Sequence, residues 1–282
     1  MPASSSNTDR SARLTRWLVT APPAAFLVVF FLIPALIMAG ASFREPGEFG
    51  GLAPLAESGT SLEAYRFILD DAIYAWILAK SFAVAGLTTV ICLLLAYPLA
   101  ILIVRSPKRQ RDVFVLLVIL PFASNFLIRI YAWMIILGPV DLLYSSVAVL
   151  VGMVYVHLPF MILPLYTNLE KHDPALLEAA QDLGAGKWAR FWRVTWPLSL
   201  PGVLSGSALV FIPVLGMFAV PELLGGTGDL LMGNLIKEQF LDNRDWPLGS
   251  ALAILLTALV LLLAGLAAWA ARKGLHGTEA VS

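Results

Sequence analysis

The stretch Glu178-Ala179-Ala180-Gln181-Asp182-Leu183-Gly184 lies between two long apolar segments and is the most informative part of this chain. It has the pattern EAA, then any three residues, then Gly. After nine further residues comes Val194-Thr195-Trp196-Pro197, which has the pattern apolar, any residue, large apolar, Pro. Gly184 can adopt the left-handed conformation that ends a helix. Asp173-Pro174, upstream, offers a helix cap followed by proline at the first helical position. These signals predict a short helix from Asp173-Pro174 to Gly184.

A second short helix is expected after this turn, at residues 187–195. Its aromatic residues can pack against the neighbouring segments. Pro197 and Pro201 are expected to stop it, because a proline inside a helix removes one hydrogen bond and clashes with the preceding turn. The whole pattern predicts a helix-turn-helix that projects from the apolar segments.

The composition places the rest of the chain in a lipid bilayer. Hydrophobic residues make up 59% of the 282 residues and charged residues 13%, whereas about a quarter of the residues in soluble domains are charged. A transmembrane helix needs about 20 mostly apolar residues. Six runs meet or approach this length: 18–43, 81–104, 113–137, 145–169, 201–224 and 247–271. We therefore predict an all-α integral membrane protein with six transmembrane helices.

Two of these runs contain residues that are unusual in a membrane span. The first is broken by three prolines, and the third carries Asn125 and Arg129. Prolines are tolerated in membrane helices when neighbouring helices, hydroxyl groups or water satisfy the freed carbonyl groups. Both runs are therefore retained as spans in the prediction.

The distribution of basic residues predicts the orientation. Thirteen of the nineteen Lys and Arg residues lie before the first run, after the last, or in the connections that follow the second and fourth runs. Cytoplasmic segments carry such an excess. We therefore expect residues 1–16 to be a cytoplasmic tail, 17–273 to form one transmembrane domain whose loop 170–200 is cytoplasmic, and 274–282 to be a second cytoplasmic tail.

Catalytic and cofactor chemistry has little support in the sequence. The three histidines lie far apart, without the spacing of a metal site, and no G-x-S-x-G nucleophile motif occurs. The segment 184–187 resembles part of a phosphate-binding loop, but Trp188 stands where Ser or Thr should bind magnesium, and Gln181 replaces the first glycine. We predict that the chain is not an enzyme and holds no cofactor and no metal.

The EAA stretch resembles the signature loop of importer-type ABC permeases, which docks onto a separate ATPase. Further stretches, at residues 120–133, 158–166 and 231–247, are similar to the first permease subunit of spermidine/putrescine importers, and the similarity covers most of the chain from about residue 80 onward. Two departures stand out. The connection 138–144 is shorter than in the family, and Trp196 replaces the usual Leu or Ile before Pro197.

The resemblance implies a heteromeric assembly in the inner membrane of a bacterium. Its members would be this subunit, a second permease subunit, two copies of an ATP-binding subunit and a periplasmic solute-binding protein, with no nucleic acid. The solute would be a polyamine or a related organic cation. Two alternatives remain open: a permease for another solute, such as an opine, an amino-acid derivative or a metal ion, and a stand-alone secondary transporter or channel. The latter would usually show repeated sets of spans, and none is found.

By the same resemblance, the ATPase contact would include six positions of the loop: Glu178, Ala179, Ala180, Asp182, Gly184 and Pro197. Small side chains such as Ala179 and Ala180 would let the helix sit in a groove on the ATPase. The alternative is an amphipathic hairpin that lies on the lipid headgroups.

Polar groups at membrane depth are costly and therefore functional candidates. Glu222 follows Phe218 by one helical turn, and a carboxylate beside an aromatic ring suits an ammonium group. We predict that Glu222 and Phe218 line the solute pathway, that Pro213 and Pro221 break the helix there, and that Lys237 pairs with Glu222 when solute is absent. Alternatively, Glu222 anchors the helix end at the interface.

Two further predictions concern the third run. Tyr131 and Trp133 are candidate walls of the solute pathway, although such residues also form aromatic belts or pack between helices. Arg129 and Asn125 are predicted to be a buried structural pair, with Arg129 bonded to carbonyl groups or to a carboxylate of the partner subunit, because a cation in the pathway would repel polyamines.

Overall fold

The computed structural model describes residues 19–54 and 59–276, so the predicted tail 1–16 and the end of the predicted tail 274–282 lie outside the described residues. The described residues form helices and their connections, without a β-strand. Five helices are long and apolar enough to cross a membrane, or six if one sharply bent pair counts as a single span. The prediction of an all-α protein with multiple membrane spans is confirmed.

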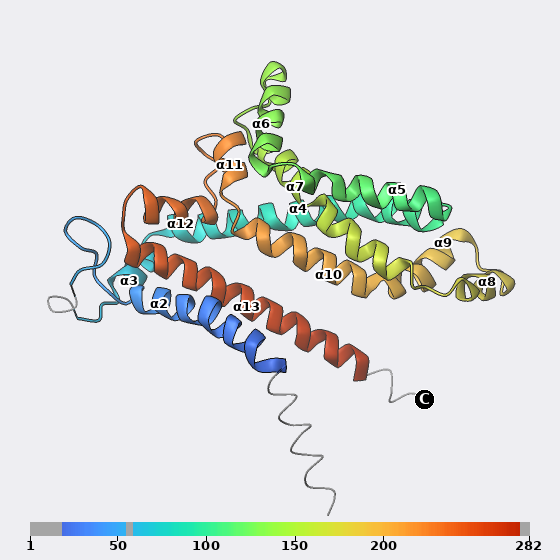
Figure 1. Cartoon of the computed structure of the whole chain (residues 1–282), viewed down its shortest axis with the longest axis horizontal. Coiled ribbons are helices and arrows are strands. Elements are labelled where there is room, and N and C mark those ends of the chain that lie inside the picture. The colour runs from blue at the N-terminus through green and yellow to red at the C-terminus, as the bar shows by residue number, and fades with distance from the viewer. Residues whose placement is uncertain (1–18, 55–58, 277–282) are drawn as a thin grey trace, which may run out of the picture. The chain divides into compact units, whose positions relative to one another are not determined.

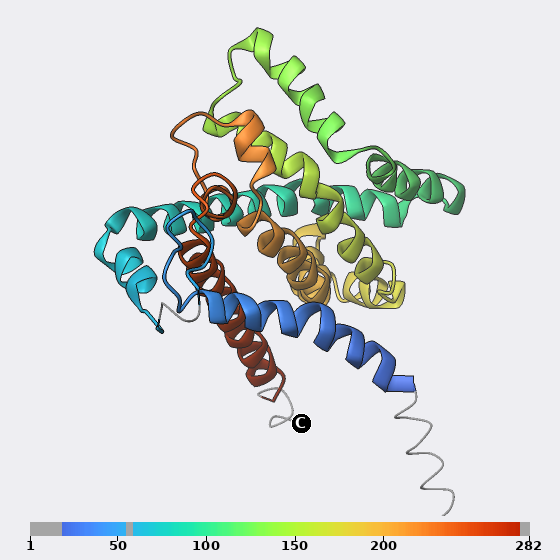
Figure 2. The same cartoon turned by 60° about the vertical axis from the view of Figure 1, so that its left-hand side comes forward.

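The chain divides into two compact units, one formed by residues 71–237 and the other by residues 1–70 and 238–282. The core of the first unit consists of α4 (Ala72–Arg105), α7 (Ser146–Leu169) and α10 (Trp196–Leu215), which pack on one another (Figures 1 and 2). Small residues allow this close packing. A Cβ atom added at Gly206 of α10 would lie 2.8 Å from the Met161 sulfur of α7.

Capping residues set where these helices begin. The Asp71 carboxylate accepts a hydrogen bond from the Ile73 N–H at 2.9 Å, and α4 begins at the next residue after the cap. The Ser145 hydroxyl accepts a bond from the Ala148 N–H at 3.2 Å at the start of α7. The predicted span 145–169 thus agrees with α7, whereas the span predicted at 81–104 begins earlier, at Ala72.

The third predicted span, 113–137, is not one straight helix. It consists of α5 (Lys108–Ile119), the 3₁₀ turn η2 (Leu120–Ala123) and α6 (Phe126–Leu137), and the chain bends by 94° between the two halves. The reason is local: Asn125 is extended and its side chain accepts a bond from the Leu127 N–H at 2.8 Å, so it caps a new helix. The length of the apolar run concealed this cap.

The fifth predicted span, 201–224, was wrong at both ends. One continuous helix runs from Lys187 to Leu215, through α9 (Lys187–Arg190), the π-helical turn η4 (Phe191–Thr195) and α10. Pro197 and Pro201 therefore do not stop the second helix of the loop. The π-turn ends at Thr195, and its closing bond runs from the Trp196 N–H to the Phe191 carbonyl, so the regular ladder of hydrogen bonds is already interrupted there. Pro197, which has no N–H to donate, follows in the first turn of α10.

The C-terminal end of this predicted span breaks at residues 216–218, and a separate short helix, α11 (Ala219–Leu224), follows. A Cβ atom added at Gly233 would lie 2.7 Å from the Gly216 carbonyl oxygen, so the backbone of α12 (Met232–Leu241) approaches closely the end of α10. The predicted helix break exists, but it lies between Pro213, inside α10, and Pro221, inside α11.

The second unit contains the other two long helices. The first predicted span corresponds to a helix at Val19–Ala41, which includes the π-turn η1 (Val28–Leu32) and α2 (Ile33–Ala41). The last corresponds to α13 (Trp246–His276), which packs on α2 and on α3 (Glu63–Asp70). Helix α13 continues to His276, so the first three residues of the predicted tail 274–282 are helical.

Candidate coupling and pathway sites

The EAA stretch forms a hairpin (residues 173–190) in which each boundary has a visible cause. Asp173 caps α8 (Pro174–Asp182) by accepting a bond from the Ala175 N–H at 2.9 Å. Gly184 has a φ of +80°, as predicted, and its N–H donates to the Gln181 carbonyl at 2.8 Å. The Ala185 N–H donates to the Ala180 carbonyl at 3.0 Å, which completes a Schellman turn. The hairpin is thus held mainly by its own backbone.

The residues of the hairpin are exposed or half-buried. Glu178, Ala179, Asp182 and Gly184 are exposed, while Ala180 is half-buried. The apolar side chains of Leu183 and Trp188 are 89% and 76% exposed. Exposed apolar side chains of this size are available for contact with a protein partner or with lipid. Pro197, the sixth predicted contact, is exposed but lies in the first turn of α10, beyond the hairpin.

A cavity of about 730 Å³ lies under the hairpin. Its lining combines apolar side chains from the ends of α4 and α7 with the basic residues Arg105, Lys187 and Arg190. Arg190 also donates to the Gln181 side chain at 2.6 Å, which ties α9 to α8. One carboxylate, Asp173, shares this lining. The cavity is therefore mainly basic, which suits acidic groups.

At the opposite end of the same unit, the α11–α12 segment (residues 216–237) carries the predicted pathway carboxylate. The Lys237 ammonium lies 3.0 Å from the Glu222 carboxylate, so the predicted pair is present. The two side chains are 25% and 44% exposed. The Glu222 N–H donates to the Phe218 carbonyl at 3.1 Å, and the Phe218 ring is 45% exposed. The structure thus brings these three predicted residues together.

A second polar group in this segment was not predicted. Asp229 is 9% exposed, and its carboxylate accepts hydrogen bonds from the Ser146 hydroxyl of α7 and from the Gly226 N–H. The Lys80 ammonium of α4 lies 3.2 Å from the same carboxylate and also donates to the Gly228 carbonyl. Burial raises the pKa of Asp229, but these bonds and the Lys80 charge outweigh it and hold the pKa below its usual value. Ser146 and Lys80 lie far from Asp229 in the sequence, so no local sequence pattern predicts this cluster.

Helix α6 carries the remaining predicted residues, and α11 packs against α6 and α7. Tyr131 is 50% exposed, and Trp133 packs edge-on against Tyr155 with 5.5 Å between ring centroids. Asn125 is exposed and serves as a helix cap, so the predicted buried pair with Arg129 is not found within this chain. The Arg129 Nε atom is buried and has no hydrogen-bond partner among the described residues.

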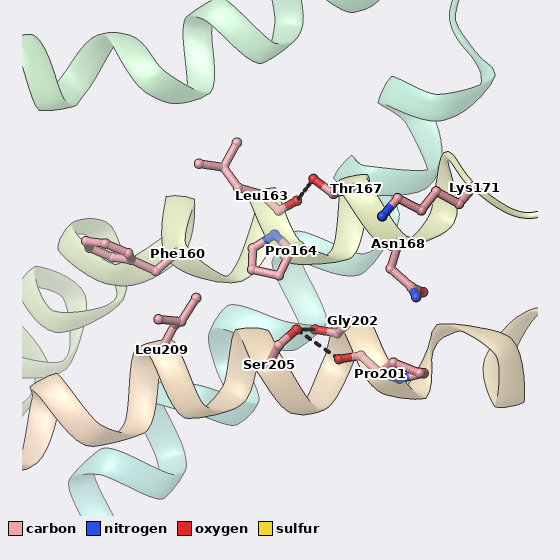
Figure 3. Close-up of a pocket in the computed structure, with 10 residues that line it drawn as sticks. All are labelled: Phe160, Leu163, Pro164, Thr167, Asn168, Lys171, Pro201, Gly202, Ser205 and Leu209. Carbon is pink, nitrogen blue, oxygen red and sulfur yellow. Dashed lines mark hydrogen bonds between the residues drawn. The ribbon is translucent and has the colours of Figure 1, made fainter. Parts of the chain in front are cut away.

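A further cavity, of about 460 Å³, opens between α7 and α10 (Figure 3). Thr167 and Ser205 line it, and both donate their hydroxyl hydrogens to carbonyl groups of their own helices. The Asn168 Oδ1 atom is buried there, and no described residue donates a hydrogen bond to it. Lys171 adds a positive charge and the lining includes no carboxylate, so this cavity offers hydrogen-bond acceptors but no charge that attracts a cation. Sequence reasoning missed it, although three polar residues in apolar runs were a signal.

Within the described part of the chain, no group of three or more His, Cys, Asp or Glu residues could hold a metal ion. Cys92 is buried in α4, and the His157 Nδ1–H donates to the Met153 carbonyl of its own helix at 2.8 Å. Both side chains lie inside the packed helices of this unit.

Known proteins resemble this chain over most of its length. The family described as "Binding-protein-dependent transport system inner membrane component" matches residues 93–273. The spermidine/putrescine transport system permease protein PotB of Haemophilus influenzae is 42% identical over 258 residues, which cover 85% of this chain and 88% of that protein. PotB of Escherichia coli K12 is 39% identical over 268 residues, with 89% and 95% covered.

The fold has a counterpart among solved structures. The crystal structure of a bacterial alginate ABC transporter, in complex with an alginate pentasaccharide-bound periplasmic protein, contains a chain that matches with a TM-score of 0.68 at 14% identity. The match covers 94% of this chain and 96% of that one. At this identity the likeness concerns the fold.

Proposed function

Since the chain belongs to the family of binding-protein-dependent transport system inner membrane components, we propose that it is a permease subunit of an ATP-driven importer of polyamines in a bacterial inner membrane. The observation that carries the solute class is the 42% identity, over 85% of the chain, to a spermidine/putrescine permease. Glu222 supports it, because it provides a partly exposed carboxylate four residues after the exposed Phe218, in the short helix α11 that follows the break.

The hairpin is the proposed contact with the ATPase. Glu178, Ala179, Ala180, Asp182 and Gly184 are exposed or half-buried, and Leu183 and Trp188 offer apolar surface that a protein partner would cover. A rigid turn with its own capping can transmit force without unfolding. We place the hairpin and both termini in the cytoplasm, in keeping with the excess of Lys and Arg on that side.

The partners follow from this role. An importer of this kind would combine the chain with a second permease subunit, two copies of an ATP-binding subunit and a periplasmic solute-binding protein. The buried Arg129 Nε group would find its acceptor on the second permease subunit. This chain would contribute the membrane passage, whereas ATP hydrolysis would occur in the separate subunit.

The ion pair between Glu222 and Lys237 would be the state of the pathway when no solute is bound. The pair is partly exposed, and such ion pairs contribute about 1 kcal/mol or less. An ammonium group of the solute can therefore replace Lys237 at little cost. Phe218 would hold the aliphatic part of the solute, and Tyr131 and Trp133 on the neighbouring α6 would form the wall.

Transport by the reconstituted assembly tests the proposal. The chain, its second permease and its ATPase are placed in proteoliposomes with ATP on the hairpin side, and labelled spermidine is supplied with the binding protein on the other side. We expect uptake that requires both ATP and the binding protein and that putrescine inhibits. Uptake without the ATPase would instead identify a stand-alone transporter, and uptake of another solute alone would correct the substrate.

A further inference from the structure

Tyr97 of α4 touches both ends of the π-helical turn that joins the hairpin to α10. Its ring centroid lies 5.6 Å from that of Phe191, the first residue of η4, and 5.7 Å from that of Trp196, the residue directly after η4. Trp192 packs between these two, at 5.1 Å and 5.7 Å. One side chain of a neighbouring helix thus spans the whole turn.

A hydrogen-bonded chain strengthens this contact. The Ser199 hydroxyl donates to the Trp196 carbonyl at 2.8 Å, and a carbonyl can only accept. The Tyr97 hydroxyl, 2.8 Å from the Ser199 oxygen, is therefore the donor in that pair. Tyr97 is 7% exposed and Ser199 is fully buried, so water does not compete for these bonds. The first turn of α10 is held to α4 by this chain.

The π-turn makes such a brace necessary. Its backbone closes with a bond from the Trp196 N–H to the Phe191 carbonyl, five residues apart, and π-turns interrupt the regular ladder of an α-helix. Pro197 follows at once and has no N–H to donate. A force applied to the hairpin would be lost in bending at this joint unless a neighbouring element held its two ends together.

We propose that Tyr97 is a positioning residue that braces the π-turn and transmits the movement of the hairpin to α4. The proposal rests on the proposed function, in which the ATPase moves the hairpin. Trp196 is part of the brace, which gives a reason for its size at a position where the family resemblance leads one to expect Leu or Ile. Without the brace, ATPase closure would move the hairpin but would move α4 less.

The test uses the whole reconstituted assembly and measures solute imported per ATP hydrolysed. Tyr97→Phe keeps the ring and removes the hydroxyl, so it should fold and should lower this ratio about threefold, within the range of mutations in a coupling network. Tyr97→Leu, which also removes the ring, should lower it further. ATP hydrolysis stimulated by the binding protein should stay within about twofold of the wild type in both variants.

Two controls separate transmission from packing. Ser199→Ala should reproduce Tyr97→Phe, and the double variant should be no worse, because both break the same chain of bonds. Phe82→Leu removes the aromatic contact at 5.7 Å between Phe82 of α4 and Phe211 of α10, elsewhere along the same two helices, and it should leave the ratio unchanged. An unchanged ratio in Tyr97→Leu, or uptake and hydrolysis that fall in proportion, would overturn the proposal. Failure of the proposed function would look different, since the wild type would then show no ATP-dependent uptake.

Discussion

The two ends of the unit formed by residues 71–237 are stabilised in opposite ways. The hairpin is held by its own backbone and caps, and it leaves Leu183 and Trp188 exposed. The α11–α12 segment is held by side chains from remote elements: the Met232 N–H donates to the Ser81 hydroxyl at 2.8 Å, and Asp229 is bound by groups on α4 and α7. The first is a preformed surface with exposed apolar groups, and the second is fastened to its own subunit.

The difference between local and remote hydrogen bonds determines how each end can move. The hairpin can move as one body, because the hydrogen bonds that hold its shape join residues within the hairpin itself. The α11–α12 segment is fixed at Asp229, and its exposed ion pair between Glu222 and Lys237 is the contact that can exchange. We infer that the hairpin receives force and that the opposite end responds through this pair.

The largest effect is expected from Gly184→Pro. Proline fixes φ near −65°, whereas Gly184 has a φ of +80°, and proline also removes the N–H that donates to the Gln181 carbonyl. The turn would open, and ATP hydrolysis stimulated by the loaded binding protein should fall to the basal rate while the subunit still inserts. Gly186→Ala is the control: its φ is −66° and an added Cβ meets nothing within 4 Å. Normal stimulation in Gly184→Pro would remove the hairpin from the ATPase contact.

Glu178→Arg tests the surface of the same hairpin without changing its backbone. Glu178 is exposed and makes no ion pair in the described part of the chain, so reversing its charge should leave the fold intact. We expect stimulated hydrolysis to fall at least about tenfold, in line with the loss of an interface residue worth about 1–2 kcal/mol. Assembly measured by co-purification of the ATPase should fall with it. Full assembly with full stimulation would contradict the assignment.

Glu222→Gln tests the opposite end. The substitution keeps the size and most of the hydrogen bonding but removes the charge, so polyamine uptake should fall about tenfold, as for loss of one charge-assisted contact. ATP hydrolysis should persist, because the hairpin is untouched. Glu222→Asp keeps the charge with a shorter reach and should retain part of the uptake. Wild-type uptake by Glu222→Gln would place the solute site elsewhere, with the partner permease as the next candidate.

The same comparison shows what the sequence can predict. The hairpin was predictable because Asp173, Pro174 and Gly184 act on residues within a few positions, and the structure confirms the cap and the turn. The pairing of Glu222 with Lys237 was also predicted, since only 15 residues separate them. The Asp229 cluster was missed because Ser146 and Lys80 lie 83 and 149 positions away. Polar contacts at such separation depend on how the helices pack.

Errors within helices had another origin. An apolar run shows that a segment can be in the membrane but not that it is straight, and the cap at Asn125 was overlooked because it lies inside such a run. Conversely, Pro197 and Pro201 are predicted to end the second helix, although Pro197 follows a π-helical turn and Pro201 lies inside α10. An apolar run or a proline does not by itself show whether a neighbouring residue caps a new helix or a π-helical turn lets the helix continue.

Asp229→Asn should destabilise the α11–α12 segment by about 1.5–3 kcal/mol, the contribution of hydrogen bonds to a charged group. Thermal unfolding of the purified assembly at neutral pH would measure it, with Asp242→Asn as an exposed control. Because the folded pKa of Asp229 is depressed, its stabilisation is present above the usual value of 3.8 and is lost as the pH falls through the lower folded pKa. The difference between variant and wild type should therefore stay constant down to about pH 5 and shrink below pH 4. A difference that instead grows on acidification would refute the ionised, bonded state.

The smallest effect is expected from Lys237→Ala. If Lys237 holds Glu222 at rest, its removal frees the carboxylate and shifts the assembly toward the state that solute normally induces. The side chains are 25% and 44% exposed, so the pair contributes about 1 kcal/mol or less, which limits the shift to about fivefold. Basal ATP hydrolysis without solute should rise about twofold to fivefold on these grounds, and Lys237→Arg, which keeps the charge, should leave it unchanged.

In the Glu222→Gln variant, the additional substitution Lys237→Ala should have no further effect, because the partner charge is already gone. A basal rate that Lys237→Ala leaves unchanged would mean that the ion pair does not restrain the transport cycle, and the response of this end would then have to come from the Asp229 cluster.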